Sequence, residues 1–298
     1  MTLVATLLSP TSALDDVALG RARAVLPGTP SAPEWLAPGS AADIFFSAGD
    51  ENDNRDIAER VREALGDQAI DVVVQKAAGR SKRLFVADMD STMIGQECID
   101  ELADLVGQKA HVAAITERAM RGELAFAPAL RERVALLKGL PARVIDDVLA
   151  HRIVLTPGGR TLVATMRANG AYACLVSGGF TAFADRIAQR IGFDEASANQ
   201  LLVDADGKLV GEVAEPILGR EAKLATLLTL RARLGLATED TLAIGDGAND
   251  LDMIRAAGLG IAFHAKPAVA AAAAARIDYC DLTAVLFIQG YRRDQFAD

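Results

Sequence analysis

The sequence is short of aromatic side chains and of positive charge, and each shortage excludes a class of protein or a mode of packing. Phe, Trp and Tyr make up only 5% of the 298 residues, so we expect helices to pack through small and aliphatic side chains. Acidic residues (40) outnumber basic ones (31), which leaves a net charge of −9. Because a phosphate backbone has to be met by clustered Lys and Arg, this balance argues against a nucleic-acid-binding protein.

Cysteine and histidine are too few and too scattered to indicate a disulfide framework or a metal cluster. None of the three cysteines forms a C-x-x-C pair, and each lies in an apolar context: Cys98, Cys174 and Cys280. This pattern is typical of buried, reduced thiols in a cytosolic protein. The three histidines are far apart and show no spacing typical of metal ligands: His111, His151 and His264.

Long apolar runs are also missing. No stretch approaches the roughly 18–20 apolar residues that span a bilayer, so we expect no membrane insertion. The alanine-rich run Ala268–Ala275 predicts a helix packed on the surface instead. The first 16 residues lack the positively charged start of a signal peptide. The sequence therefore predicts a cytoplasmic protein.

What the sequence does contain is a hydrophobic fraction of 51% and a length that suggests about two domains. Residues 1–79 predict a small α/β unit, joined to the rest by a linker at 77–83. Its expected strands and helices are Leu3–Leu8, Ala13–Leu26, Ala42–Ser47, Asn54–Leu65 (capped by Asn52 or Asp53) and Ile70–Gln75. The segment 27–39, rich in proline and glycine, predicts a long loop or one further short strand.

From Leu84 onward, short apolar strands alternate with helical segments, which predicts a parallel α/β sheet. The expected strands are Leu84–Asp88, Tyr172–Val176, Leu242–Ile244 and Leu259–Phe263. We assign residues 84–98 and 153–298 to this core. Residues 99–152 are expected to form a helical cap over the carboxyl edge of the sheet, with breaks at Gly107, Gly122 and 139–141. A β-hairpin is predicted at 201–213, around the turn Asp206-Gly207.

Two acids follow the first strand of this core. Asp88 ends the apolar run, and Asp90 comes two positions later. In an extended segment such residues point the same way, just beyond the carboxyl end of the strand, where open parallel sheets place their ligands. Carboxylates this close repel unless a cation, a shared proton or a phosphoryl electrophile accounts for them. The alternative is an acidic turn after a buried strand.

Three later segments favour the first interpretation. Ser177-Gly178-Gly179 follows a strand and opens a helix, which lets backbone N–H groups approach an anion, although it is also compatible with a simple tight turn. Lys223 lies in the expected helix Arg220–Leu234, where a lysine is usually a solvated charge. The run GDGAND places Asp246 and Asp250 in a glycine-shaped loop after another strand, as an oxygen-only site for Mg²⁺ would require.

In chain order, DMDST, SGG, the lysine and GDGAND resemble the four motifs of the haloacid-dehalogenase-like (HAD) phosphatase superfamily. Together with GELAFAPALRERVALLKGLP and IGDGANDLDMIRAAGLGIAFHAKP, they resemble the phosphoserine phosphatases over about residues 84–290. The resemblance implies a Rossmann-like core with an inserted helical cap. It also implies Mg²⁺-dependent hydrolysis of O-phospho-L-serine to L-serine and phosphate, the last step of serine biosynthesis.

The resemblance also implies a role for each matching residue. Asp88 would be the nucleophile that forms an aspartyl-phosphate, and Asp90 the general acid and base. Mg²⁺ would be held by the Asp88 side chain, the Asp90 backbone carbonyl and Asp246, with Asp250 orienting the metal shell. The phosphoryl group would be held by Ser177, the backbone N–H of Gly178, Lys223 and Asn249.

Substrate choice would rest on the cap side. The resemblance implies that Glu97 pairs the substrate ammonium, that Arg133 clamps its carboxylate and that Phe126 is an apolar lid. The alternatives are that Glu97 is an acid favoured at a helix start and that Arg131 or Arg133 is a solvated charge. The competing function is a phosphatase or phosphotransferase for another small phosphomonoester. A ligand sensor with a decayed site would lack one of the acids, and all of them are present.

The first 79 residues fall outside this resemblance. Their expected order of strands and helices is compatible with a ferredoxin-like, ACT-type module, which some phosphoserine phosphatases use for amino-acid feedback or dimerisation. The loop Ser9-Pro10-Thr11-Ser12 lacks a glycine that would shape a ligand site. We therefore favour a unit for packing or homodimer formation, with serine feedback as the alternative.

Overall fold

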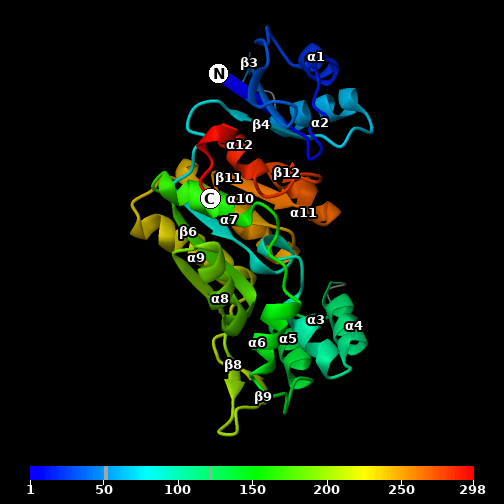
Figure 1. The fold of residues 1–298 in the computed structure, drawn as a ribbon, viewed down its shortest axis with the longest axis vertical. Coiled ribbons are helices and arrows are strands. Elements are labelled where there is room, and N and C mark those ends of the chain that lie inside the picture. The colour runs from blue at the N-terminus through cyan, green and yellow to red at the C-terminus, as the bar shows by residue number, and fades with distance from the viewer. Residues whose placement is uncertain (50–52, 121–122) are drawn as a thin grey trace.

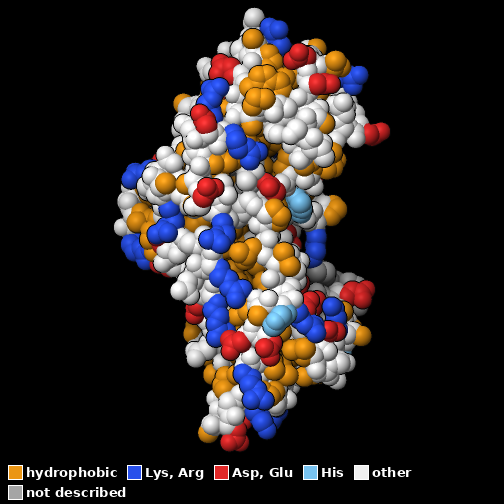
Figure 2. Space-filling view, in the orientation of Figure 1, with side chains coloured by type: hydrophobic (Ala, Val, Ile, Leu, Met, Phe, Trp, Pro, Cys, Tyr) orange, Lys and Arg blue, Asp and Glu red, His pale blue; other side chains and the backbone are white. Residues whose placement is uncertain are grey.

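The computed structural model describes every residue except 50–52 and 121–122. Figure 1 shows three parts along the longest axis: the N-terminal unit at the top, the sheet core in the middle and the cap at the bottom. Acidic and basic side chains are interspersed over the face shown in Figure 2, with apolar side chains scattered among them. Within the described part of the chain, none of the helices is both long and apolar enough to cross a bilayer.

The N-terminal unit is a four-stranded sheet in the order β2-β3-β1-β4, with antiparallel neighbours. Its elements are β1 (Thr2–Leu8), α1 (Asp16–Val25), β2 (Glu34–Ala37), β3 (Ala41–Ser47), α2 (Asn54–Leu65) and β4 (Asp71–Lys76). This βαββαβ order is that of a ferredoxin-like unit. The two helices share one apolar core with the sheet.

The expected elements of this unit are present, with two adjustments. Helix α1 begins three residues later than expected, at Asp16, because the side chain of Asp15 caps it by accepting from Ala18 N. The segment 27–39 holds the short edge strand β2. Asp53 caps α2 through Arg55 N, whereas the alternative cap, Asn52, lies outside the described residues.

The core is a six-stranded sheet in the order β12-β11-β10-β5-β6-β7, and its neighbouring strands run parallel. The strands are β5 (Leu84–Ala87), β6 (Tyr172–Phe180), β7 (Glu195–Asn199), β10 (Thr241–Gly245), β11 (Leu259–Phe263) and β12 (Ala275–Ile277). The helices are α7 (Gly159–Ala168), α8 (Thr181–Ile191), α9 (Arg220–Arg233), α10 (Leu251–Ala256), α11 (Pro267–Ala272) and α12 (Ala284–Ile288). Alternate residues of β5 face two different apolar clusters, so this strand is buried on both sides.

Two expectations about the core are wrong. Strand β6 does not end at Val176 but continues through Ser177-Gly178-Gly179 to Phe180, whose partner on β7 is Asn199. The serine and glycines therefore lie in extended backbone. The alanine run is not one helix, because α11 ends at Ala272 and Ala275 begins β12, paired with Ile261. Strand pairing overrides the helix propensity of alanine here.

The cap consists of four helices and a hairpin that comes much later in the chain. The helices are α3 (Cys98–Leu105), α4 (Lys109–Met120), α5 (Phe126–Ala135) and α6 (Val144–His151). Breaks fall at Gly107 and Gly139, as expected, while Gly122 lies outside the described residues. The predicted hairpin, β8 (Leu201–Val203) and β9 (Leu209–Val213), is present, and Leu209 N donates to Leu140 O. The hairpin thereby extends the cap, which the sequence did not indicate.

The N-terminal unit is joined to the core by buried polar contacts. The carboxylate of Asp71, on β4, accepts from the backbone N–H groups of Asp278, Tyr279 and Cys280, just beyond β12. All three cysteines are free and buried, as expected.

Candidate active site

Three carboxylates converge at the carboxyl edge of the sheet. Asp88 follows β5 and Asp246 follows β10, and these strands are parallel neighbours that pair Ala87 with Ile244. Carboxylate oxygens of Asp88, Asp246 and Asp250 lie within 4.8 Å of one another. The strand order thus brings together acids that are more than 150 residues apart in the chain, and the interpretation as a plain acidic turn is excluded.

Lys223 lies inside this acidic cluster. Its side chain is fully buried, and Nζ is 2.6 Å from Asp88 Oδ1 and 2.6 Å from Asp250 Oδ1. The alternative of a solvated charge is therefore wrong for this lysine. Burial alone would lower the pKa of Lys223, but the two carboxylates outweigh it and raise the pKa above its ordinary value. Lys223 remains a cation.

One lysine does not balance the three acids. Burial, and then the charge of Asp250, raise the pKa of Asp246 to about 6 and that of Asp88 well above its ordinary value. Asp250 has both oxygens engaged, since Oδ1 meets Lys223 and Oδ2 accepts from Gly247 N at 3.0 Å. Asp88 and Asp246 remain as the better metal ligands. A group of oxygen donors with excess negative charge fits a hard cation.

The carboxylate of Asp90 is directed elsewhere, toward the start of the cap. Its Oδ1 accepts from Cys98 N at 3.0 Å, and its Oδ2 accepts from Ser177 Oγ at 3.3 Å. The surrounding protein desolvates the carboxyl group and raises its pKa. Asp90 is therefore not a member of the three-acid group, although it lies next to Ser177, which the sequence predicted as a phosphate ligand.

The serine and glycines of β6 form the opposite wall of the site. Ser177 is buried, and its Oγ also accepts from Gly179 N at 2.8 Å. The carbonyl of Gly178 accepts from the side chain of Asn199. Asn249 is half-buried in the short turn Ala248–Asp250 (η3), beside the acids.

Glu97 stands at the entrance to the cap, before α3. It occupies the N-cap position but makes no capping hydrogen bond, and instead its Oε1 accepts from Ser91 Oγ at 2.7 Å. The residue is exposed, although neighbouring protein atoms desolvate its carboxyl group. This desolvation, and then the charge of Asp90, raise the pKa of Glu97 to about 7. Glu97 lies at the start of α3, so the alternative of an acid favoured there by the helix dipole stays open beside the predicted role.

Arg133 and Arg131 differ in their surroundings. Arg133 is half-buried on α5, where desolvation lowers its pKa and the charges of Glu97, Asp100 and Asp90 oppose that effect. Its guanidinium donates to Ala129 O at 3.2 Å and to Thr116 Oγ1 at 3.3 Å. Arg131 is exposed and pairs with Glu215. Of the two arginines, Arg131 is the solvated one.

Several residues that support these groups were not predicted from the sequence. Ser91 donates to Glu97 from a left-handed backbone conformation (φ 55°) in the irregular turn Met89–Met93. Thr92 Oγ1 lies 3.4 Å from Asp246 Oδ1. Asn199 is buried at the end of β7. Its only signal was a polar residue at the end of a short strand that was itself not predicted.

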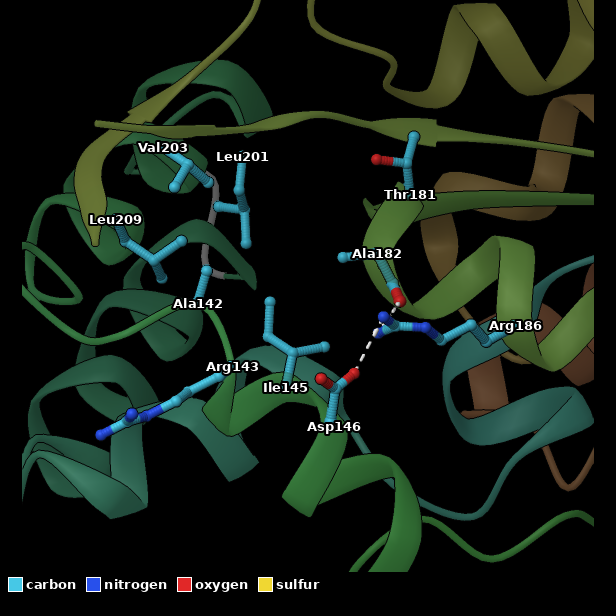
Figure 3. Close-up of a pocket in the computed structure, with 10 residues that line it drawn as sticks. All are labelled: Ala142, Arg143, Ile145, Asp146, Thr181, Ala182, Arg186, Leu201, Val203 and Leu209. Carbon is cyan, nitrogen blue, oxygen red and sulfur yellow. Dashed lines mark hydrogen bonds and ion pairs between the residues drawn. The ribbon is translucent and has the colours of Figure 1, made fainter. Parts of the chain in front are cut away.

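A separate cavity of about 300 Å³ lies between α6, α8 and the hairpin β8–β9 (Figure 3). Apolar side chains line it, among them Ile145, Leu201 and Leu209, and the ion pair of Asp146 with Arg186 crosses its rim. None of the residues predicted for the active site is among those that line it. This cavity is distinct from the acidic cluster.

A family comparison agrees with the fold and the cluster. Residues 85–255 match the model of the haloacid dehalogenase-like hydrolases, and this stretch covers more than half of the chain. The chain therefore belongs to the haloacid dehalogenase-like hydrolase family. Within that family it is similar to phosphoserine phosphatases. The phosphoserine phosphatase SerB2 of Mycobacterium tuberculosis is 46% identical over 231 residues, 77% of this chain and 56% of the relative.

Solved structures show the same relationship. A HAD family hydrolase from Salmonella enterica serovar Typhi superposes with a TM-score of 0.86 at 30% identity, covering 96% of this chain and 98% of the other. A substrate-bound phosphoserine phosphatase superposes with a TM-score of 0.65 at 40% identity, covering 69% of this chain and 97% of the other. This chain spans little more than half the length of SerB2.

Proposed function

We propose that the protein hydrolyses O-phospho-L-serine to L-serine and phosphate with Mg²⁺, as the last step of serine biosynthesis. The observation that carries the proposal is the buried cluster of Asp88, Lys223 and Asp250 on the core, with Glu97 just before the first cap helix and Arg133 in the cap. The similarity to phosphoserine phosphatases supports it.

The reaction would proceed in two displacements at phosphorus. In the first, an Asp88 oxygen forms a bond to phosphorus, the bond from phosphorus to the seryl oxygen breaks, and Asp90 gives that oxygen a proton. In the second, Asp90 takes a proton from water as the water oxygen displaces Asp88 and releases phosphate. The raised pKa of Asp90 supports its role as the initial proton donor.

The anionic nucleophile has to approach an anionic substrate. Lys223 supplies one positive charge at Asp88, and Ser177, the N–H of Gly178 and Asn249 would hold phosphoryl oxygens. Asp88, Asp246 and the backbone carbonyl of Asp90 would hold Mg²⁺, and Asp250 would orient the metal shell. When bound, the cation would neutralise the charge of the acids and of the phosphate.

Two groups on the cap side support an amino acid as the leaving group. An acid at Glu97 suits an ammonium group, and the forked guanidinium of Arg133 suits a carboxylate. A substrate without one of these groups would leave its partner unpaired, which costs roughly 1–3 kcal/mol. Selectivity therefore requires both the amine and the carboxylate.

The test is phosphate release from a panel of phosphomonoesters, with Mg²⁺ and with EDTA. Phosphoethanolamine lacks the carboxylate, 3-phosphoglycerate lacks the amine, and p-nitrophenyl phosphate lacks both. We expect phosphoserine to be preferred by about tenfold or more, equivalent to about 1.4 kcal/mol, and the activity to be lost in EDTA. Equal activity across the panel would favour a phosphatase or phosphotransferase for another small phosphomonoester.

We also infer that the N-terminal unit serves packing or homodimer formation and that the enzyme works in the cytoplasm. The three free, buried thiols support a reducing compartment. Light scattering on the full chain tests the dimer. Calorimetry with serine tests the alternative of amino-acid feedback, and serine binding there would favour feedback over simple packing.

A further inference from the structure

The ring of Phe126 rests in a corner formed by two glycines of the core. Phe126 is the first residue of α5 in the cap, whereas Gly178 lies on β6 and Gly219 directly precedes α9. A Cβ added at Gly178 would lie 2.9 Å from Cζ of the ring, and one added at Gly219 would lie 3.0 Å from Cδ1. The lid residue thus contacts the core at positions where side chains are missing.

The backbone does not explain why residue 219 is a glycine. Its φ of −122° and ψ of −154° are extended values that any residue adopts. Residue 219 is also the N-cap of α9, a position where Ser, Asn or Asp generally caps at least as well as glycine. The neighbour that would resist a side chain is the ring of Phe126, at 3.0 Å, 3.4 Å and 3.7 Å from the added Cβ. The requirement for glycine comes from the cap.

The two walls of the corner are fastened to each other. The buried side chain of Asn199 donates to Gly178 O at 2.9 Å and to Leu218 O at 3.0 Å, and it accepts from Leu218 N at 2.7 Å. Because these bonds join the two walls, we expect the ring, rather than the walls, to yield by the few tenths of an ångström that a methyl group needs. An added Cβ at residue 219 therefore pushes the ring of Phe126 away from the core.

The same glycine begins the helix that carries the catalytic lysine. Lys223 N donates to Gly219 O, so Gly219 and Lys223 are one helical turn apart along α9. A displacement of Phe126 at this point would raise the lid directly beside the phosphate site.

We propose that Gly219 is a positioning residue whose missing Cβ provides the seat on which Phe126 closes the cap over a bound phosphomonoester. The consequence for turnover rests on the proposed function, whereas the seat itself rests on the packing of Phe126. Gly219 acts through Phe126 alone and touches no reacting atom.

A double-mutant cycle tests the proposal on the full-length protein with Mg²⁺. We expect Gly219→Ala to lower kcat/KM for phosphoserine about tenfold in the wild-type background. In the Phe126→Ala background, the same substitution is expected to change kcat/KM less than twofold, because no ring remains to be displaced. Gly20→Ala is the matched control, since its added Cβ meets no atom within 4 Å.

Equal losses in both backgrounds would overturn the proposal, and so would an undiminished kcat/KM in Gly219→Ala. Thermal unfolding of the four proteins of the cycle shows whether a loss of kcat/KM reflects misfolding. If Gly219→Ala alone unfolds, recovery of the fold in the Phe126→Ala/Gly219→Ala protein tests the same contact. A crystal structure of Gly219→Ala gives a readout independent of activity, in which an unmoved Phe126 ring would refute the seat.

The proposed substrate and the proposed role of Gly219 can be refuted independently of each other. If the wild-type protein prefers p-nitrophenyl phosphate to phosphoserine, the proposed substrate is wrong, and the cycle is measured with p-nitrophenyl phosphate. If the protein hydrolyses neither compound, the proposed reaction is wrong. The position of the Phe126 ring in the Gly219→Ala crystal structure then decides whether Gly219 positions that ring.

Discussion

The ammonium of Lys223 lies 2.6 Å from Oδ1 of Asp250, and neither side chain is exposed to solvent. A buried ion pair of this kind gains little net stability, because desolvation of both charges opposes their attraction. Its effect is to hold the lysine rigidly, with Nζ also 2.6 Å from Asp88, the proposed nucleophile. Removing the lysine would leave two buried acids without their cation.

Lys223→Met is therefore expected to abolish turnover and also to lower the free energy of unfolding by about 3–5 kcal/mol. Urea unfolding at pH 7.5 in EDTA measures the second effect. Lys208→Met, at an exposed lysine of the hairpin turn, is the control and should unfold like the wild-type protein. An unchanged urea midpoint for Lys223→Met would mean that the buried cluster is not held by this charge.

Asp88→Asn should abolish turnover while leaving the fold intact. The amide keeps the size of the carboxyl group but cannot form the acyl-phosphate bond at phosphorus. Phosphate release measures the activity, and circular dichroism checks the fold. Turnover near the wild-type rate would show that the nucleophile is a different residue.

Glu97 should make the preference for phosphoserine depend on pH. Its pKa is raised from 4.5 to about 7, so the carboxyl group is mostly neutral below pH 7 and mostly ionised above it. Because the ionised form attracts an ammonium, kcat/KM for phosphoserine relative to 3-phosphoglycerate, which lacks the amine, should rise between pH 6 and 8. Both substrates are alkyl phosphates with a carboxylate, so the ratio largely cancels the titration of the phosphate group. In Glu97→Gln we expect a low ratio that does not vary with pH, and a rise that persists would exclude Glu97 as its source.

Mg²⁺ should stabilise the protein through Asp246. The pKa of Asp246 is raised from 3.8 to about 6 in the folded, cation-free protein. Its ionised form therefore lowers the free energy of unfolding above pH 6, and this loss disappears as the pH falls toward 3.8. At a Mg²⁺ concentration of one hundred times Kd, binding adds about 2.7 kcal/mol, or roughly 5–10 °C in Tm. Thermal unfolding at pH 7.5 with and without Mg²⁺ measures this shift. An equal shift in Asp246→Asn would place the cation elsewhere.

Asp71→Asn should weaken the junction of the N-terminal unit without affecting the chemistry. The substitution replaces a carboxylate that accepts three backbone N–H groups by an amide that accepts fewer. We expect the free energy of unfolding to fall by about 1–3 kcal/mol. The value of kcat at 20 °C should stay within twofold of wild type, and a large loss of kcat would instead couple this junction to the active site.

The features that could be predicted from the sequence are those that depend on local pattern and motif spacing. Asp88 and Asp246 were expected at strand ends because apolar runs precede them, and the parallel pairing of β5 with β10 brings them together. The cap helices and the hairpin were visible in periodicity and turn residues. These features depend on neighbours in the sequence.

What the sequence did not show depends on partners distant in the chain. Ala275 lies in a strand because Ile261 pairs with it, which outweighs the helix propensity of an alanine run. Asn199 was missed because its partners, Gly178 and Leu218, meet it only after folding. The burial of Lys223 was equally invisible, since a lysine in an amphipathic helix is usually solvated.

Strand β5, which leads to Asp88, is hydrogen bonded on both edges by strands made later: β6 starts at Tyr172 and β10 at Thr241. A ribosome-bound chain therefore presents Leu84–Ala87 as an open, apolar edge while the next 150 or so residues are synthesised. The acids and their lysine meet only when β10 adds to the sheet. Nascent chains that stop short of that point would lack the assembled acidic cluster and would keep an unpaired apolar strand edge, which favours aggregation.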